Sequence, residues 1–185
     1  LLAAAVEPEH PRDWRPQMLL FGDNPDQRKP LMLLAGWVAG SSGLISVVQI
    51  VTGKGAKALK NQQEAPSELE KEVAGYGPEW FPLVVRAEDF GQGVDMLVQA
   101  AGLGPLKTNL ILFGWPSPEK LKGTFIHKAI YDNHLKTVFQ RGRNIMILDA
   151  KPEAWDKMNV TPEKERRVDV WWWNDATGRD RKSVV

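Results

Sequence analysis

The stretch Gln17-Met-Leu-Leu-Phe-Gly-Asp23 is a short apolar run that ends against glycine and aspartate. Four further runs of this kind follow it, separated by amphipathic segments whose apolar residues recur with helical spacing. Short buried strands that alternate with helices are typical of a parallel sheet with helices on both faces. We therefore predict an α/β fold with a doubly wound, mostly parallel sheet of five strands, at Gln17–Phe21, Ile45–Val51, Phe81–Val85, Asn109–Phe113 and Asn144–Leu148.

Composition excludes several classes of site without naming a function. The chain has 185 residues, of which 43% are hydrophobic, enough to bury the core of one α/β domain. Lysine and arginine number 24 against 23 for aspartate and glutamate, a formal net charge of +1, so no overall field favours a nucleic-acid or an anionic-lipid partner. The sequence has no cysteine, which excludes disulfides, iron–sulfur ligation and thiolate zinc sites.

An uncharged segment, Leu31–Gly53, is long enough to cross a hydrocarbon core of roughly 30 Å. Its first half has apolar residues at helical spacing, Gly40-Ser-Ser-Gly43 interrupts it, and its second half is rich in valine and isoleucine. This pattern favours a helix at about Pro30–Val38, a turn and a buried strand over a membrane span. We therefore expect no direct membrane insertion by this chain.

The segment after the second run is expected to be helical but interrupted. Proline cannot donate a helical hydrogen bond, so Pro66 predicts a break. Ser67 with Glu70 three residues later forms a capping-box pattern, which predicts that the helix restarts there and ends at Gly75. Two further helices are expected, one started by Asp89 and stopped by Gly102, the other opened by Ser117-Pro118 and stopped by Gly142.

Glycines near the strand ends form a candidate nucleotide site. Gly22 and Asp23 follow the first strand, and Gly102, Gly104 and Gly114 are expected near the point where the strand order reverses, where phosphates bind in doubly wound sheets. ATP is the candidate ligand. The alternative is structural: a helix cap, a turn and a strand end.

No residue set predicts catalysis or metal binding. His127 and His134 have no carboxylates at ligand spacing and no recognisable serine nucleophile nearby, so we expect neither an enzyme nor a metal site. Near the end of the chain, Val168–Trp173 reads as a strand that is apolar on both faces. The residues after it are too few and too polar to cover it, so either the chain continues in its parent protein or Trp171, Trp172 and Trp173 are a candidate interface. The alternative is that these tryptophans pack at strand ends.

Three motifs, taken in order, resemble the cytoplasmic C-terminal domain of cation-chloride cotransporters of the prokaryotic type, in the amino acid-polyamine-organocation superfamily. They are Trp14-Arg-Pro-Gln17 running into an apolar strand, Gly102-Leu-Gly104 followed by Leu112-Phe-Gly-Trp-Pro116, and Asp169-Val-Trp-Trp172. The resemblance implies a domain that follows a bundle of membrane helices, with two halves that are each similar to universal stress proteins. Nucleotide-binding stress proteins have Gly-x2-Gly-x9-Gly-Ser/Thr; here the first gap is one residue, and Trp115 replaces the final Ser or Thr.

On this resemblance, residues 1–10 are expected to be a connector, 11–150 a universal-stress-like α/β subdomain, and 151–185 part of a second, similar subdomain. The implied function is regulation and dimerisation of a secondary transporter that couples chloride to sodium or potassium movement, without catalysis. The implied partners are the transporter's own transmembrane domain and a second copy, on the cytoplasmic side of the cell membrane. The alternative is a soluble nucleotide-binding protein of the universal-stress type.

Overall fold

The computed structural model describes residues 14–22, 25–53, 56–103, 106–115, 134–149, 155–157, 160–165, 170–174 and 180–184. The chain divides into two compact units, Leu1–Asp149 and Ala150–Val185. The division falls close to the boundary expected from the sequence, whereas the connector and the partial second subdomain stay predictions.

Five parallel strands form the sheet of the first unit, in the order β3-β2-β1-β6-β7. In sequence order of the five parallel strands this is 3-2-1-4-5, the doubly wound arrangement, so the predicted fold class is confirmed. β4 (Gly102–Leu103) and β5 (Leu106–Lys107) form a separate antiparallel pair. The five strands are β1 (Gln17–Phe21), β2 (Leu44–Thr52), β3 (Trp80–Ala87), β6 (Leu110–Gly114) and β7 (Asn144–Leu148).

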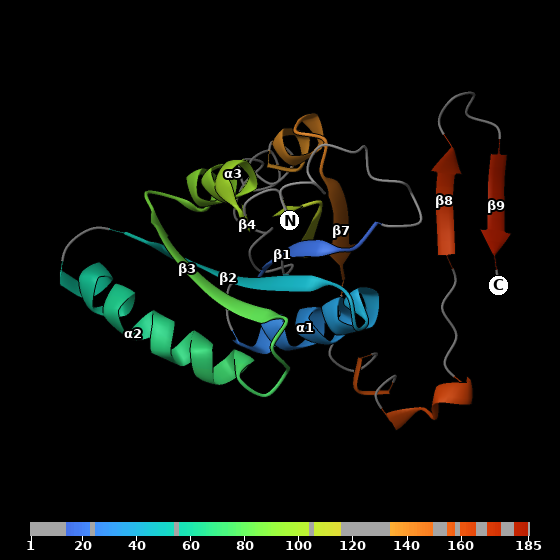
Figure 1. Cartoon of the computed structure of the whole chain (residues 1–185), viewed down its shortest axis with the longest axis horizontal. Coiled ribbons are helices and arrows are strands. Elements are labelled where there is room, and N and C mark those ends of the chain that lie inside the picture. Colours follow the sequence, from blue (N-terminus) through green and yellow to red (C-terminus); the bar gives the residue numbers. More distant parts are fainter. Residues whose placement is uncertain are drawn as a thin grey trace, which may run out of the picture. The chain divides into compact units, whose positions relative to one another are not determined.

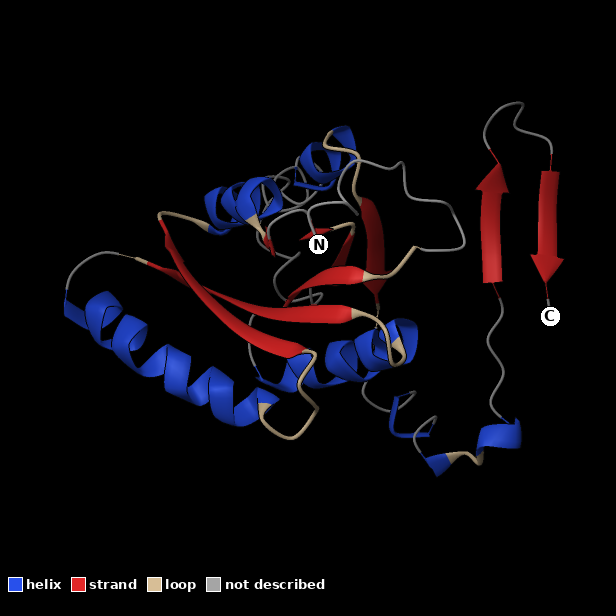
Figure 2. Ribbon diagram, viewed as in Figure 1, coloured by secondary structure: helices blue, strands red, loops and turns tan. Residues whose placement is uncertain are grey.

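Helices cover both faces of the sheet (Figures 1 and 2). α1 (Pro25–Ala39) and α2 (Ala56–Val73) lie on one face, and α3 (Phe90–Ala100) lies on the other with the helix at residues 134–140. β1 shows why two cores form. Its side chains alternate, Met18 and Leu20 packing in the first core and Leu19 and Phe21 in the second. A strand buried on both faces reads as a continuous apolar run, as β1 does.

α1 begins at Pro25, five residues before the predicted start, and continues through Pro30. Pro25 occupies the first helical position, where a missing N–H costs little. The uncharged segment folds as the rest of α1, a turn and β2, as predicted. Within the described part of the chain, no helix is both long and apolar enough to cross a bilayer.

The predicted break at Pro66 is wrong, because α2 runs through it without interruption. The side chains of Ala65, Leu69 and Val73, at intervals of four, are buried. This continuous stripe holds the helix on the sheet. Pro66 has no N–H to donate to the carbonyl four residues before it, but Pro66 is exposed, so water can donate to that carbonyl instead. Ser67 is therefore not an N-cap; its hydroxyl donates to the carbonyl of Glu64 at 3.0 Å.

Two predicted helix ends on the second face are confirmed. Asp89 caps α3, accepting a hydrogen bond from the Gln92 N–H at 2.9 Å. The helix at residues 134–140 is stopped by Gly142, two residues after its end, whose φ of +68° favours glycine. The Arg143 N–H then donates a hydrogen bond to the Val138 carbonyl at 3.3 Å. The predicted start of that helix at Ser117 lies outside the described residues.

The second unit includes a 3-10 turn (Glu163–Glu165) and a hairpin of β8 (Val170–Asn174) with β9 (Asp180–Val184). The predicted tryptophan strand is present, and the polar residues that follow supply its hydrogen-bonded neighbour. The register pairs Trp171 with Ser183 and Trp173 with Arg181. The prediction concerned only the residues that would pack on the two faces of the tryptophan strand, so it missed the strand that pairs with its edge.

Candidate functional site

The carboxyl edge of the sheet, where all five parallel strands end, brings two of the predicted site residues together. The strand order reverses between β1 and β6, the place where doubly wound folds bind ligands. Gly22 follows β1, Gly114 ends β6, and their preceding residues Phe21 and Phe113 are register partners. A Cβ on either glycine would lie within 3.4 Å of the Leu31 side chain. Gly22 and Gly114 therefore share one small area beside α1.

Gly102 lies at the opposite edge. It pairs with Lys107 in the short β4–β5 ladder, just before Asn109, whose N–H donates to the carbonyl of Gln17 at the start of β1. The whole length of β6 separates it from Gly114. The structure thus does not bring Gly102 to the point where the strand order reverses, because the Gly-Leu-Gly motif precedes β6 instead of following a strand. Asp23 and Gly104 lie outside the described residues.

Arg28 occupies the space next to Gly22. A Cβ on Gly22 would lie 2.5 Å from Arg28 Cγ. The guanidinium donates from Nε to Glu72 Oε1 at 3.0 Å, from Nη2 to Glu72 Oε2 at 2.7 Å and from Nη1 to the Gly22 carbonyl at 3.3 Å. Arg28 is 3% exposed. This cation neutralises the Glu72 carboxylate and ties α1 and α2 to the end of β1.

The exposed charges around this edge are of both signs in the described part of the chain. In the segments that follow the strands, four exposed carboxylates stand beside the exposed cations Lys29, Lys60 and Arg86, so no field of one sign meets a triphosphate here. The carboxylates are Asp26, Glu88, Asp89 and Asp149.

Because Arg28 fills the space beside Gly22 and Gly102 lies at the opposite edge, we expect millimolar ATP to leave the thermal midpoint of the chain unchanged. A ligand that binds the folded state stabilises it by mass action, so thermal shift with and without ATP measures this directly. The control variant is Gly114→Ala, whose Cβ would meet Leu31 at an ordinary contact distance of 3.4 Å. A saturable rise in the midpoint that Gly114→Ala abolishes would contradict the expectation and support nucleotide binding.

A second polar cluster near this edge combines His134 with two aspartates of the α3 region. A Cβ on Gly91 would collide with the His134 ring, and the Phe90 ring meets the imidazole edge-on at a centroid distance of 6.0 Å. Burial lowers the pKa of His134 below 6.5, while the negative charges of Asp95 and Asp89 act in the opposite direction. Sequence reasoning saw His134 but not these carboxylates, which lie about forty residues earlier in the chain.

This cluster does not form a metal centre. Among the described residues, no group of three histidine, cysteine, aspartate or glutamate side chains is placed to hold an ion. Asp95 instead acts on His134 through its negative charge, and neither His134 Nε2 nor Asp95 Oδ1 makes a hydrogen bond with the described residues.

His134 gives a pH-dependent component of stability. The unfolded imidazole binds a proton as the pH falls through about 6.5, while burial opposes protonation in the folded state. The unfolded state then holds more protons, so the free energy of unfolding falls as the pH drops below about 6.5. We expect His134→Gln to weaken this fall, measured by urea denaturation on either side of that pH. An identical pH dependence in the variant would contradict it.

The amino edge, where the five strands begin, fixes the Trp14-Arg-Pro-Gln17 segment. The Asn109 side chain donates from Nδ2 to the Arg15 carbonyl at 2.7 Å and accepts at Oδ1 from the Gln17 N–H at 2.9 Å. On the other side, the Leu44 N–H donates to the Pro16 carbonyl at 2.9 Å. The chain is therefore held on both sides before it becomes the central strand β1.

Asn109→Leu is expected to destabilise the chain by about 1–3 kcal/mol, because it leaves the Gln17 N–H without its acceptor. In this variant, the backbone amide of Gln17 should also exchange its hydrogen faster. The matched control is Asn144→Leu, which loses an exposed hydrogen bond of 3.1 Å to the Asn109 carbonyl and should cost less. Equal effects of the two variants would contradict a special role for Asn109.

An apolar groove of about 380 Å³ lies under the carboxyl end of α3. α3 approaches the sheet closely at its start, where a Cβ on Gly93 would lie 2.8 Å from Ile50. The end of α3 leaves the groove, and none of the described residues that line it is charged. The lining residues include Gln17, Phe81, Pro82, Leu97, Ala101 and Thr108.

Comparison with known proteins relates the chain to a transporter. No family model matches it. It is 30% identical over 107 residues to solute carrier family 12 member 2 of Squalus acanthias, a match covering 58% of this chain and 9% of that protein. The chain thus spans less than a tenth of the length of this curated relative. The similarity agrees with the three motifs and supports a domain related to cation-chloride cotransporters.

Proposed function

We propose that this chain is a regulatory and dimerisation domain on the cytoplasmic side of a membrane transporter that couples chloride to sodium or potassium movement. The observation that carries the proposal is the match of 107 residues to a solute carrier. The described fold agrees with the universal-stress-like subdomain that the resemblance implies. In the described residues, neither the carboxyl edge nor the His134 cluster supplies a set of catalytic groups.

The Trp14–Gln17 segment supplies a route for regulation. Residues 1–10, which precede it in the chain, are the proposed connector to the membrane part, and the segment leads directly into the central strand. Hydrogen bonds to Asn109 and Leu44 hold it on both sides. A displacement of the connector would therefore pull on β1, the central strand of a sheet that is packed against helices on both faces.

Ion uptake by the parent polypeptide in vesicles tests the proposal. We expect chloride-dependent uptake of sodium or of rubidium, a tracer for potassium. Asn109→Leu should change the rate at equal abundance in the membrane, and the exposed Asn144→Leu should not. Uptake that does not require chloride would contradict the assignment, and uptake indifferent to both variants would contradict the regulatory role.

Dimerisation is tested separately by sedimentation velocity of the purified domain at increasing concentration. We expect a concentration-dependent shift to twice the monomer mass. A monomer at every concentration, with the second subdomain complete, would contradict this part of the proposal. Trp171→Ser, Trp172→Ser and Trp173→Ser together test whether the β8 tryptophans form the interface.

One observation keeps a second candidate, a nucleotide-binding protein of the universal-stress type. Gly22 and Gly114 do meet where the strand order reverses. Two observations oppose it: Arg28 fills the space beside Gly22, and Gly102 lies at the opposite edge of the sheet. The ATP titration described above distinguishes the two candidates.

A further inference from the structure

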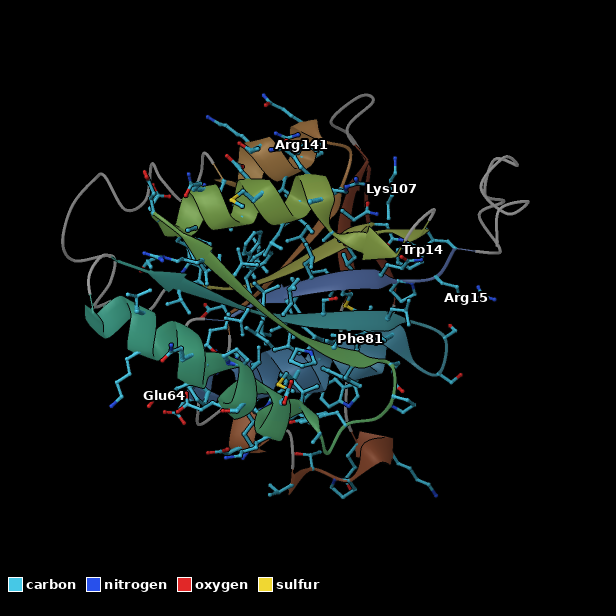
Figure 3. All side chains as sticks on the ribbon, turned by 60° about the vertical axis from the view of Figure 1, so that its left-hand side comes forward. Trp14, Arg15, Glu64, Phe81, Lys107 and Arg141 are labelled. Atoms are coloured by element: carbon cyan, nitrogen blue, oxygen red, sulfur yellow. The ribbon has the colours of Figure 1, made fainter. Side chains whose placement is uncertain are left out.

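The amino edge of the sheet concentrates positive charge although the whole chain is nearly neutral. Arg15 precedes β1, Lys107 precedes β6, and Arg141 and Arg143 precede β7. These three strands are adjacent in the sheet, at a spacing of about 4.8 Å between neighbours. We call these four residues the cationic patch. In Figure 3, Arg15, Lys107 and Arg141 follow one another along one side of the first unit.

In the described part of the chain, few carboxylates lie at the amino edge of the sheet. In the loops that lead into the five strands the described carboxylate is that of Glu79, half-buried before β3 and separated from β1 by β2. At the last turn of α2, exposed Glu70 and Lys71 offset each other. Because these cations precede three neighbouring strands, they give one side of the domain a positive charge that faces a nearby anionic surface.

Exposed aromatic side chains flank the patch. Trp14, next to Arg15, is 40% exposed, and Phe139, two residues before Arg141, is 74% exposed. Each aromatic side chain thus stands beside a cation, one at either side of Lys107. Aromatic rings that project beside cations suit the interface of an anionic bilayer, where rings insert among headgroups and cations pair with phosphates. A soluble polyanion would need the cations alone.

We propose that the cationic patch, with Trp14 and Phe139, docks the amino edge on an anionic lipid surface. The carboxyl edge, whose exposed charges are of both signs, would then face away from the lipid. The segment that leads into β1 emerges at the docked edge. The proposal deepens the proposed function by naming the surface beside which the domain works, and it rests on that function only for the origin of the membrane.

Cosedimentation of the purified chain with lipid vesicles tests it. The vesicles contain phosphatidylcholine alone, or phosphatidylcholine with one third replaced by phosphatidylserine. We expect binding to the phosphatidylserine vesicles that weakens with added salt, and much weaker binding to phosphatidylcholine alone. Since each cation near such a surface contributes about fivefold, Lys107→Gln with Arg141→Gln should lower the partition coefficient by about 25-fold.

The matched control neutralises two exposed cations near the other edge, Lys29→Gln with Arg86→Gln, and therefore has the same net charge. It should change the partition coefficient by less than about fivefold, the contribution of a single contacting cation. Equal losses in the two double variants, or no preference for phosphatidylserine, would overturn the proposal. Thermal melting of each variant checks that it is folded.

Phe139→Ser separates a membrane from a soluble polyanion. It should lower vesicle binding without changing retention on heparin. Vesicle binding indifferent to Phe139→Ser, with heparin retention lost in the Lys107→Gln and Arg141→Gln variant, would overturn the membrane assignment. These measurements use the isolated chain, whereas the proposed function is tested by chloride-dependent uptake with the parent polypeptide. A failure of lipid binding and a failure of the proposed function can therefore be told apart.

Discussion

Replacing Glu72 with alanine is expected to lower the free energy of unfolding by about 3 kcal/mol, because it leaves a buried guanidinium without its counter-charge. Arg28 is 3% exposed and makes two charged hydrogen bonds of 3.0 Å or less to this carboxylate. Glu72 retains some contact with water, its side chain being 22% exposed, which places the cost at the low end for a buried pair. Urea denaturation measures the change.

The matched control is Glu64→Ala on the same helix. Its ion pair with Lys60 spans 3.7 Å and is 55% exposed on the glutamate side, so its loss should cost at most about 1 kcal/mol. Adding Arg28→Met to Glu72→Ala removes the unpaired charge and should restore part of the stability. Equal costs for the two single glutamate variants, or no rescue by Arg28→Met, would contradict the assignment of a buried ion pair.

Phe113→Ala is expected to cost about 3–5 kcal/mol, through lost burial and the cavity that remains. Phe113 is 2% exposed on β6 and stacks on Phe21 of the neighbouring strand at a centroid distance of 5.1 Å. Two central parallel strands meet there, so little relaxation can fill the space. In a chain of this size the thermal midpoint should fall by about 10 °C.

Phe139→Ala is the control, because it removes the same side chain where it is 74% exposed. It should change stability by less than about 0.5 kcal/mol. A small effect of Phe113→Ala, comparable with that of Phe139→Ala, would mean that the second core is not packed as described. Calorimetry of both variants decides.

The apolar runs predicted the sheet because strands buried on both faces carry their signal locally. β1 and β7 occupy the predicted residues, and the other three strands differ from their predictions by one or two residues at either end. The capping of α3 by Asp89 was equally local. Pro66 was misjudged because its own backbone favours a break, while the stripe of Ala65, Leu69 and Val73 decides through packing against the sheet.

The candidate site depended on contacts between distant segments, which spacing alone does not reveal. Arg28 and Glu72 are 44 residues apart, so their positions in the sequence do not pair them. One signal was available: Arg28 continues the helical stripe of Leu31, Met32 and Ala35, so its side chain had to be buried and paired. Gly102 was placed at the wrong edge, because a Gly-rich motif does not reveal at which end of a strand it lies.

The composition of the chain did not predict the cationic patch, for a related reason. A net charge of +1 averages over the chain, whereas the cations that precede three adjacent strands come together only when the sheet forms. Charge at an edge is a property of topology. The nearly neutral total therefore did not exclude an anionic partner for one side of the domain.

The most direct test of the central claim is to read the parent open reading frame on both sides of this chain and score its hydropathy. The account predicts about ten or more segments of roughly 20 apolar residues before Leu1, the signature of a transporter's membrane domain. A start codon just upstream with no such segments would contradict the transporter assignment and leave the nucleotide-binding candidate to be tested.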